Sequence, residues 1–270
     1  YEDAGASASD TLDGSLAVKS VSTVNTDVVG SYTVTYSVSD TNGNTAADVV
    51  RTVGVVDTIK PVITLLGNAT ETVEAKGTYT DVGASASDTL DGSLTVTSLS
   101  SVNTDAVGSY SVTYSVSDAN GNAADSVTRT VGVVDTTKPV ITLLGNATEI
   151  VEAKSTYTDV GASASDTLDG SLTVTSVSTV DTDTLGSYSV TYSVSDANGN
   201  AAEPVTRTVS VVDTTKPVIT LLGSVTETVE AKGNYTDAGA SASDTLEGNL
   251  TDSVTSVSTV NTDAVGSYSV

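Results

Sequence analysis

Hydrophobic and polar residues alternate one by one along much of this chain. In residues 108–118, Tyr110, Val112 and Tyr114 occupy every second position, and serine or threonine fills the positions between them. A period of two is typical of an antiparallel β-strand with one buried and one solvated face. Residues 126–134 show the same alternation, and the intervening Asn120–Gly121 pair is a strong hairpin signal. The two segments therefore predict a β-hairpin, with the tyrosines on its inward face.

The whole pattern repeats with a period of 78 residues. The segment that begins at Tyr1 returns at Tyr79, Tyr157 and Tyr235. Such self-similarity is the signature of a repeat array. Each complete copy holds six or seven strand-like segments and none with helical period, so we predict an all-β tandem array of β-sandwich modules. The predicted modules span residues 1–57, 58–135, 136–213 and 214–270, the first incomplete at its N-terminus and the last at its C-terminus.

Composition excludes several classes of protein. The 270 residues include 34 acidic and 10 basic residues, for a net charge of −24, and they include neither cysteine nor histidine. Disulfides, thiolate sites and histidine bases are therefore excluded. Such a charge repels phosphate backbones, so we expect no nucleic-acid partner, and no apolar run reaches the ~20 residues that span a bilayer. We expect no enzyme, because serine lacks a histidine to activate it and each carboxylate pair recurs in every module.

Three segments of the repeat resemble a known family. They are VDTTKPVITLLG, VEAKGTYTDVGASASDTLDGSL and VGSYSVTYSVSDANGNAA, and they resemble the bacterial immunoglobulin-like repeats of large surface adhesins and extracellular matrix proteins. They are similar to hyalin-type repeats as well. The resemblance covers essentially the whole chain and implies immunoglobulin-like β-sandwich modules. It also implies an extracellular or cell-surface location and an extended stalk or matrix protein that usually depends on calcium. Antibody-type domains are excluded, because the core cysteine pair and tryptophan are absent.

The expected strand directions bring acidic loops together at each module boundary. If the strands alternate as the hairpin predicts, the SDTLDG and SDANGN loops lie at the start of a module, and the VEAKG and NTDAVG turns lie at its far end. The far end of one module, the linker and the start of the next module then meet. Like charges repel there unless a cation neutralises them, and Ca²⁺ takes 6–8 oxygen ligands in flexible geometry. A cadherin-like plan of this kind predicts Ca²⁺ at each boundary.

The candidate Ca²⁺ ligands are carboxylates and asparagine amides from these loops and linkers. They are Asp57, Glu74, Asp88, Asp91, Asp105, Asp118, Asn120, Asn122, Asp135, Glu152, Asp166, Asp169, Asp196, Asn198, Asn200, Asp213, Asp244 and Glu247. Each has a plainer interpretation: the asparagines and the SDTLDG aspartates are turn formers, and the linker aspartates are ordinary linker residues. A solvated surface role is the simpler interpretation for Glu74 and Asp105.

Two non-enzymatic functions remain open. The first is a Ca²⁺-stiffened stalk that extends a surface adhesin. The second is a repeating subunit of an extracellular filament or sheath, in which identical chains make lateral contacts. The expected partners are Ca²⁺, neighbouring repeats and identical chains. We expect the chain to be a window cut from a longer array.

Overall fold

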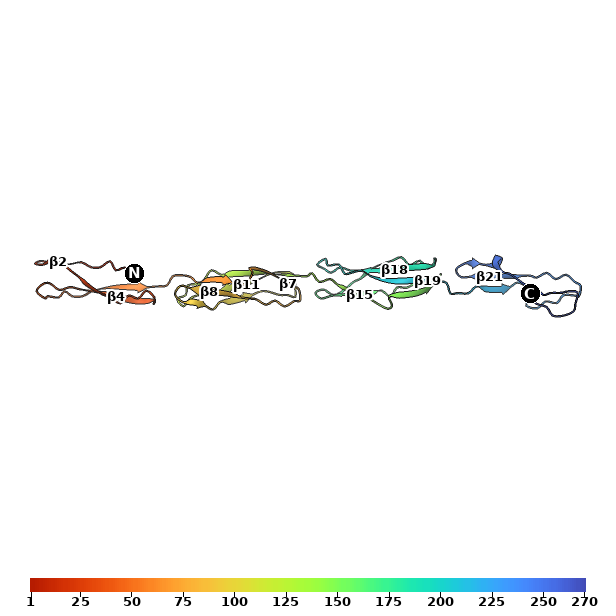
Figure 1. The fold of residues 1–270 in the computed structure, drawn as a ribbon, viewed down its shortest axis with the longest axis horizontal. Helices are drawn as coiled ribbons and strands as arrows, with labels where there is room; N and C mark the ends of the chain where they lie inside the picture. The colour runs from red at the N-terminus through yellow and green to blue at the C-terminus, as the bar shows by residue number, and fades with distance from the viewer. The chain divides into compact units, whose positions relative to one another are not determined.

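The structure, a computed structural model, describes residues 1–270 and is built from β-strands (Figure 1). It divides into two units, Tyr1–Val134 and Asp135–Val270, which are described separately. The first unit contains the first two repeats and the second unit contains the last two. No helix is long and apolar enough to cross a membrane. The all-β prediction is confirmed.

The second repeat contains seven strands, as the alternating segments predict. They are β6 (Val62–Leu65), β7 (Thr70–Glu74), β8 (Ala84–Asp88), β9 (Gly92–Leu94), β10 (Thr97–Ser100), β11 (Gly108–Ser115) and β12 (Val127–Val134). One sheet has the order β6-β8-β9 and the other has the order β10-β11-β12-β7. Strand β7 runs parallel to β12, and the other neighbours are antiparallel. These pairings match the strand directions inferred from the sequence.

The segment from Gly92 to Ser100 forms two strands instead of one. The sequence predicts a single strand here, but β9 pairs with β8 in one sheet and β10 pairs with β11 in the other. Leu94 and Val96 both pack against the core where the chain crosses between the sheets. The inward alternation continues through the crossing, so the hydrophobic pattern alone could not locate the break.

The third repeat has the same strands and sheets. They are β13 (Val140–Leu143), β14 (Thr148–Glu152), β15 (Ala162–Asp166), β16 (Gly170–Leu172), β17 (Thr175–Ser178), β18 (Gly186–Ser193) and β19 (Val205–Val212). Its core contains Ile141, Val190, Tyr192 and Val209. The core of the second repeat contains the residues 78 positions earlier, so one sequence pattern produces one core.

The outer repeats contain fewer strands. The first has β1 (Ala8–Asp10), β2 (Gly14–Leu16), β3 (Lys19–Ser22), β4 (Gly30–Ser37) and β5 (Val49–Val55), and the fourth has β20 (Val218–Leu221), β21 (Ala240–Asp244) and β22 (Gly248–Asn249). The fourth copy of the sequence is two residues longer than the others, and a 3₁₀ turn at Thr251–Ser253 lies at the insertion. The insertion follows β20 and β21, which pair as the corresponding strands of the second and third repeats do.

A buried arginine organises each complete core. Arg129 of β12 is 0% exposed and lies on the inward face, where the strand otherwise carries valine. It donates hydrogen bonds to the carbonyls of Asn68 (2.9 Å) and Gly83 (3.2 Å), and it also bonds the Leu66 carbonyl and pairs with Asp81. Its guanidinium carbon lies 5.7 Å from the centre of the Tyr114 ring. The arginine thus joins turns of both sheets, and Arg207 makes the same bonds in the third repeat.

The two tyrosines of β11 have different roles. The ring of Tyr114 is buried, as predicted, and its hydroxyl donates to Asp81. Burial and the hydrogen bond to the Asp81 carboxylate raise the pKa of Tyr114 above its ordinary value. Tyr110 is only half-buried, and its hydroxyl donates to the carbonyl of Ala106 at 2.9 Å, four residues upstream. This is the tyrosine-corner arrangement of immunoglobulin-like sandwiches, and it anchors the turn before the strand.

Candidate metal centre

Three groups of carboxylates come together where a linker enters a repeat. They are Asp57 with Asp88 and Asp118, Asp135 with Asp169 and Asp196, and Asp213 with Asp244 and Glu247. In each group every residue offers one carboxylate oxygen, and these three oxygens lie within 4.8 Å of one another. Every member is a candidate ligand from the sequence, and each group contains one linker residue and at least one residue of the SDTLDG-type loop.

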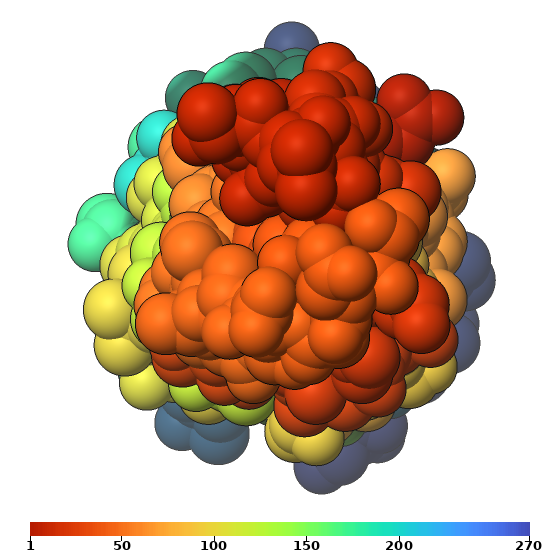
Figure 2. Space-filling view, turned by 90° about the vertical axis from the view of Figure 1, so that its left-hand side faces the viewer, coloured from red at the N-terminus to blue at the C-terminus, as the bar shows by residue number.

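The two loops of a repeat lie side by side at the end where the linker enters. In the second repeat the Asp91 carboxylate accepts a hydrogen bond from the backbone N–H of Ala119 (2.8 Å). In the first repeat the backbone N–H of Thr41 donates to Asp13 (3.0 Å). Figure 2 shows this end of the first repeat, with its red and orange loops packed against each other. Both loops therefore lie at the end that the strand directions predict.

Asp88 has one carboxylate oxygen with a role in the loop and one without. Its Oδ1 accepts the backbone N–H groups of Leu90 (2.7 Å) and Asp91 (3.3 Å) and so closes the turn after β8. Its Oδ2 is buried and has no hydrogen-bond partner. The whole residue is only 9% exposed. A buried carboxylate oxygen without a donor is costly, because it has lost its hydration without replacement. Asp166 and Asp244 repeat this arrangement.

Asp118 is held by the hairpin loop that follows β11. Its Oδ1 accepts the backbone N–H groups of Asn120 (3.0 Å) and Asn122 (2.8 Å), and its Oδ2 accepts the side-chain amide of Asn122 (2.7 Å). Burial opposes ionisation, but these hydrogen bonds outweigh it and lower the pKa of Asp118. Gly121 completes the turn with φ +92°, a left-handed conformation that favours glycine. The turn-forming interpretation of these residues is therefore visible in the structure.

The same asparagines tie the linker to the hairpin loop. The side-chain amide of Asn120 donates to Asp57 Oδ2 (3.2 Å), and that of Asn122 donates to the Asp57 carbonyl (3.3 Å). In the third repeat, Asn198 and Asn200 make the same bonds to Asp135 (2.8 and 3.1 Å). The asparagines act here as donors that position the linker carboxylate.

The third and fourth repeats vary the arrangement of the carboxylates. In the third repeat the group contains Asp169, while the Oδ2 of Asp166 is the buried oxygen without a partner. In the fourth repeat Glu247 replaces the second aspartate of the loop. A hydrogen bond with Asp244, burial, and the charges of Asp244 and Asp213 raise the pKa of Glu247. The direction of this shift reflects the negative charge gathered at the linker.

The candidates at the far end of a repeat have other contacts. Asp105 forms an exposed ion pair with Lys76 (2.9 Å), and Glu74 is half-buried at the end of β7. Glu152 of β14 accepts hydrogen bonds from the backbone and hydroxyl groups of Thr214 (both 2.8 Å) and Thr215 (3.0 and 2.8 Å). The bonds from the backbone and hydroxyl of Thr214 and from Thr215 lower the pKa of Glu152 to about 2. Glu152 thus joins the linker from the side of the preceding repeat.

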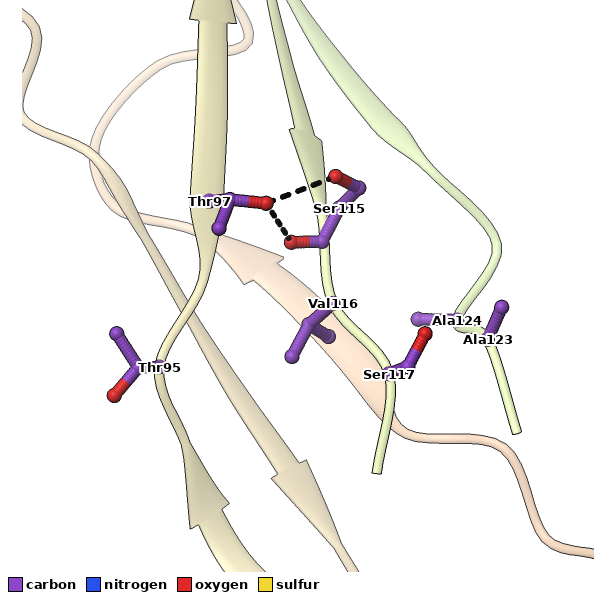
Figure 3. A pocket seen from close by; sticks show the side chains of 7 residues that line it. All are labelled: Thr95, Thr97, Ser115, Val116, Ser117, Ala123 and Ala124. Carbon is purple, nitrogen blue, oxygen red and sulfur yellow. Dashed lines mark hydrogen bonds between the residues drawn. The ribbon is translucent and has the colours of Figure 1, made fainter. Parts of the chain in front are cut away.

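Two pockets lie in the second repeat. One, of about 330 Å³, is lined by Thr95, Thr97, Ser115, Val116, Ser117, Ala123 and Ala124 (Figure 3). The other, of about 410 Å³, is lined by residues of the Tyr79 turn and the β10 segment. Neither is lined by a charged side chain.

Sequence reasoning missed two features of the repeat. The first is the buried arginine, whose place on the inward face follows from its parity with Val131 and Val133 in β12. The second is the difference between Tyr110 and Tyr114, which share one face in the pattern but have separate partners. The alternation in β12 could have placed the arginine on the inward face, because it occupies the same alternate positions as the buried valines. Nothing in the spacing distinguishes Tyr110 from Tyr114.

Comparison with known proteins identifies the same repeat. A family model described as "Bacterial surface protein, Ig-like domain" matches residues 1–55, 63–133, 141–211 and 219–270. No curated protein matches the chain.

Two solved structures share limited similarity with the chain. The M60 catalytic domain with the CBM51-1 and CBM51-2 domains from Clostridium perfringens ZmpB is 16% identical, with a TM-score of 0.33. That match covers 78% of this chain and 37% of the other, so this chain spans little more than a third of its length. The lipoprotein BT2262 from Bacteroides thetaiotaomicron is 15% identical, with a TM-score of 0.25, over 54% of this chain and 99% of the other.

Proposed function

Because this chain belongs to the family of bacterial surface proteins with Ig-like domains, we propose that it is a non-enzymatic stalk at the cell surface, stiffened by Ca²⁺ at its repeat boundaries. The repetition supports this function, since the same fold and the same acidic groups recur from repeat to repeat. A catalytic site has no need of such copies. A stalk does, because each further repeat adds roughly 26 Å of reach, given strands of up to eight residues at ~3.3 Å per residue.

The observation that carries the proposal is the buried Oδ2 of Asp88. It has no donor, and the Asp88 carboxylate lies with those of Asp57 and Asp118. A cation would neutralise the group and give the orphaned oxygen a partner. The available donors are all oxygens, which suits a hard cation, and the flexible loop geometry suits Ca²⁺ better than the tight octahedron of Mg²⁺.

The linker aspartate explains how a cation would stiffen the chain. Asp57 lies between β5 of the first repeat, which ends at Val55, and β6 of the second, which begins at Val62. A cation held by Asp57, Asp88 and Asp118 would bind the linker to both loops of the following repeat. The linker would then lose the conformational freedom that lets adjoining repeats bend. On the other side, Glu152 shows how a preceding repeat holds the linker without a cation.

Thermal unfolding of the full chain in chelator and in Ca²⁺ tests the proposal. At a Ca²⁺ concentration tenfold above Kd, linkage should raise the Tm by about 5–10 °C for a domain of this size. The shift should disappear for the second repeat in Asp88→Asn, and it should persist in Asp105→Asn, which removes the same charge from an acid paired with Lys76. Small-angle scattering should show larger dimensions in Ca²⁺ than in chelator. Equal Tm and equal dimensions in both conditions would refute the cation and the stiffening together.

A further inference from the structure

The outer face of the larger sheet has few charges and is rich in hydroxyl groups. In the second repeat the outward residues of the four strands and the residues next to them are Thr70, Thr72, Thr97, Leu99, Ser101, Ser109, Ser111, Thr113, Ser115, Thr128, Thr130 and Gly132. We call this surface the hydroxyl face. The twelve residues include no acidic or basic one, although the chain carries a net charge of −24. Glu74, the last residue of β7, borders the face on the same side of the strand as Thr70 and Thr72. The acidic groups of the second repeat lie instead in its turns, at the ends of its strands or beside Arg129.

Hydroxyl pairs across the strands keep the face ordered. Thr97 Oγ1 lies 3.0 Å from Ser115 Oγ, and Thr113 Oγ1 lies 3.5 Å from Thr128 Oγ1 (Figure 3 shows the first pair). The third repeat makes the same pairs, Thr175 with Ser193 (3.1 Å) and Thr191 with Thr206 (3.4 Å). The side chains are therefore preorganised, which lowers the entropy cost of covering them.

An exposed aliphatic residue recurs in the edge strand of this face. Leu99 of β10 is 78% exposed, and Val177 of β17 is 70% exposed at the corresponding position. Val21 of the first repeat occupies it too, while the neighbouring outward positions carry small polar residues or Lys19. The strands β10 and β17 are also sheet edges, with one side of the backbone unpaired. An apolar side chain beside an open edge is a feature that natural proteins usually cover.

We propose that the hydroxyl face is a lateral contact between identical chains. Two acidic chains repel at their loops, so a second copy approaches most easily through a surface without charge. The other sheet also has an uncharged outer face, but its strands contain only three to five residues. The larger face covers about 400 Å², from two strands of eight residues and two of four and five residues, at ~3.3 Å per residue and about 4.8 Å between strands. It is therefore the better contact surface, and the proposal does not depend on the cation site.

The size of the face predicts association through several repeats at once. One pair of faces buries about 800 Å² in total, below the 1,200–2,000 Å² of a stable interface. Two repeats that pair along the same two chains bury about 1,600 Å², which lies within this range. The second contact also forms at a high effective concentration, which strengthens the association. The contact would be weak for one repeat and substantial for an array, as an extracellular filament or sheath requires.

Sedimentation of the full chain in chelator tests the proposal, since no cation can then bridge the chains. We expect the average mass to rise with concentration, and more so at high salt, which screens the repulsion between acidic chains. The variant with Leu99→Glu and Val177→Glu should associate at least about tenfold more weakly, because it places like charges on both faces of the contact. The control with Val62→Glu and Val140→Glu changes residues that are each 65% exposed on the smaller sheets and should associate like the original chain.

Three results would overturn the proposal. The first is a chain that stays monomeric at every concentration and salt. The second is an equal loss of association in both variants, which would indicate charge alone. The third is a chain that binds polysaccharide, does not self-associate, and loses polysaccharide binding only in the Leu99→Glu and Val177→Glu variant. That result would assign the hydroxyl face to a carbohydrate. Circular dichroism of each variant checks that the strands remain formed.

Discussion

Replacing Arg129 with methionine should destabilise the second repeat selectively. The side chain is 0% exposed, and its removal takes the guanidinium donor from the carbonyls of Leu66 and Asn68. Asp81 loses its cationic partner and keeps the hydroxyl of Tyr114 as a donor. Loss of one partner of a buried ion pair costs about 3–5 kcal/mol. Because the Asp81 side chain is still 23% exposed, the lower end, about 3 kcal/mol, applies. A repeat of this size has a free energy of unfolding of about 4–12 kcal/mol, so Arg129→Met removes a large share of it.

Hydrogen exchange read by mass spectrometry is the suitable assay, because it reports on each repeat separately. A loss of about 3 kcal/mol raises the population of the open form by about two orders of magnitude. Amide protection in β11 and β12 should fall by that factor, while β18 and β19 keep theirs. Arg207→Met should give the mirror result in the third repeat. Unchanged protection in β11 and β12 would show that the buried arginine is dispensable and would refute the reasoning.

Three further predictions concern single side chains. Tyr110→Phe removes the hydrogen bond to the Ala106 carbonyl and should lower the free energy of unfolding by about 1 kcal/mol in denaturant titrations, whereas a decrease under about 0.3 kcal/mol would contradict the tyrosine-corner role. The pKa of Glu152 is lowered to about 2, so its bonds to the linker should be fully formed at pH values above the ordinary glutamate pKa and should be lost as the pH falls towards 2. In NMR spectra, the amide signals of Thr214 and Thr215 should shift with a midpoint near that pH. A midpoint near 4.3 would disprove the contact. Asp81→Asn combined with Arg129→Met should cost less than the two separate changes added together, because the two groups are ion-paired; simple additivity in the same titrations would deny the coupling.

The sequence predicted most of the fold because strand parity and the 78-residue period are strong signals. The alternation around Val112 and Tyr114 identified the buried face, and the hairpin at Asn120–Gly121 set the direction of the neighbouring strands. The break between β9 and β10 could not be predicted, since Leu94 and Val96 keep the alternation while the chain changes sheet. The position of a crossing depends on how two sheets close around a core, and that is not encoded in a local pattern.

The candidate site was predicted in part. The topology argument brought the linker aspartate Asp57 to the loops that contain Asp88 and Asp118, and the structure places them together. It did not foresee that Asp105 would pair with Lys76, because the reach of a lysine side chain across two turns depends on their exact spacing. The burial of one Asp88 oxygen also required coordinates, since sequence shows which residues lie in a loop but not which atoms the loop leaves without a donor.

Calorimetric titration of the full chain with Ca²⁺, after removal of all divalent cations, tests the central claim most directly. The account predicts saturable binding at the three linker sites, and it predicts that binding disappears when Asp57, Asp135 and Asp213 are all changed to asparagine. The matched control changes Asp27, Asp105 and Asp183, which lie outside the three carboxylate groups, and should bind Ca²⁺ like the original chain. Absence of binding at millimolar Ca²⁺, or binding that survives in the linker variant, would contradict the account.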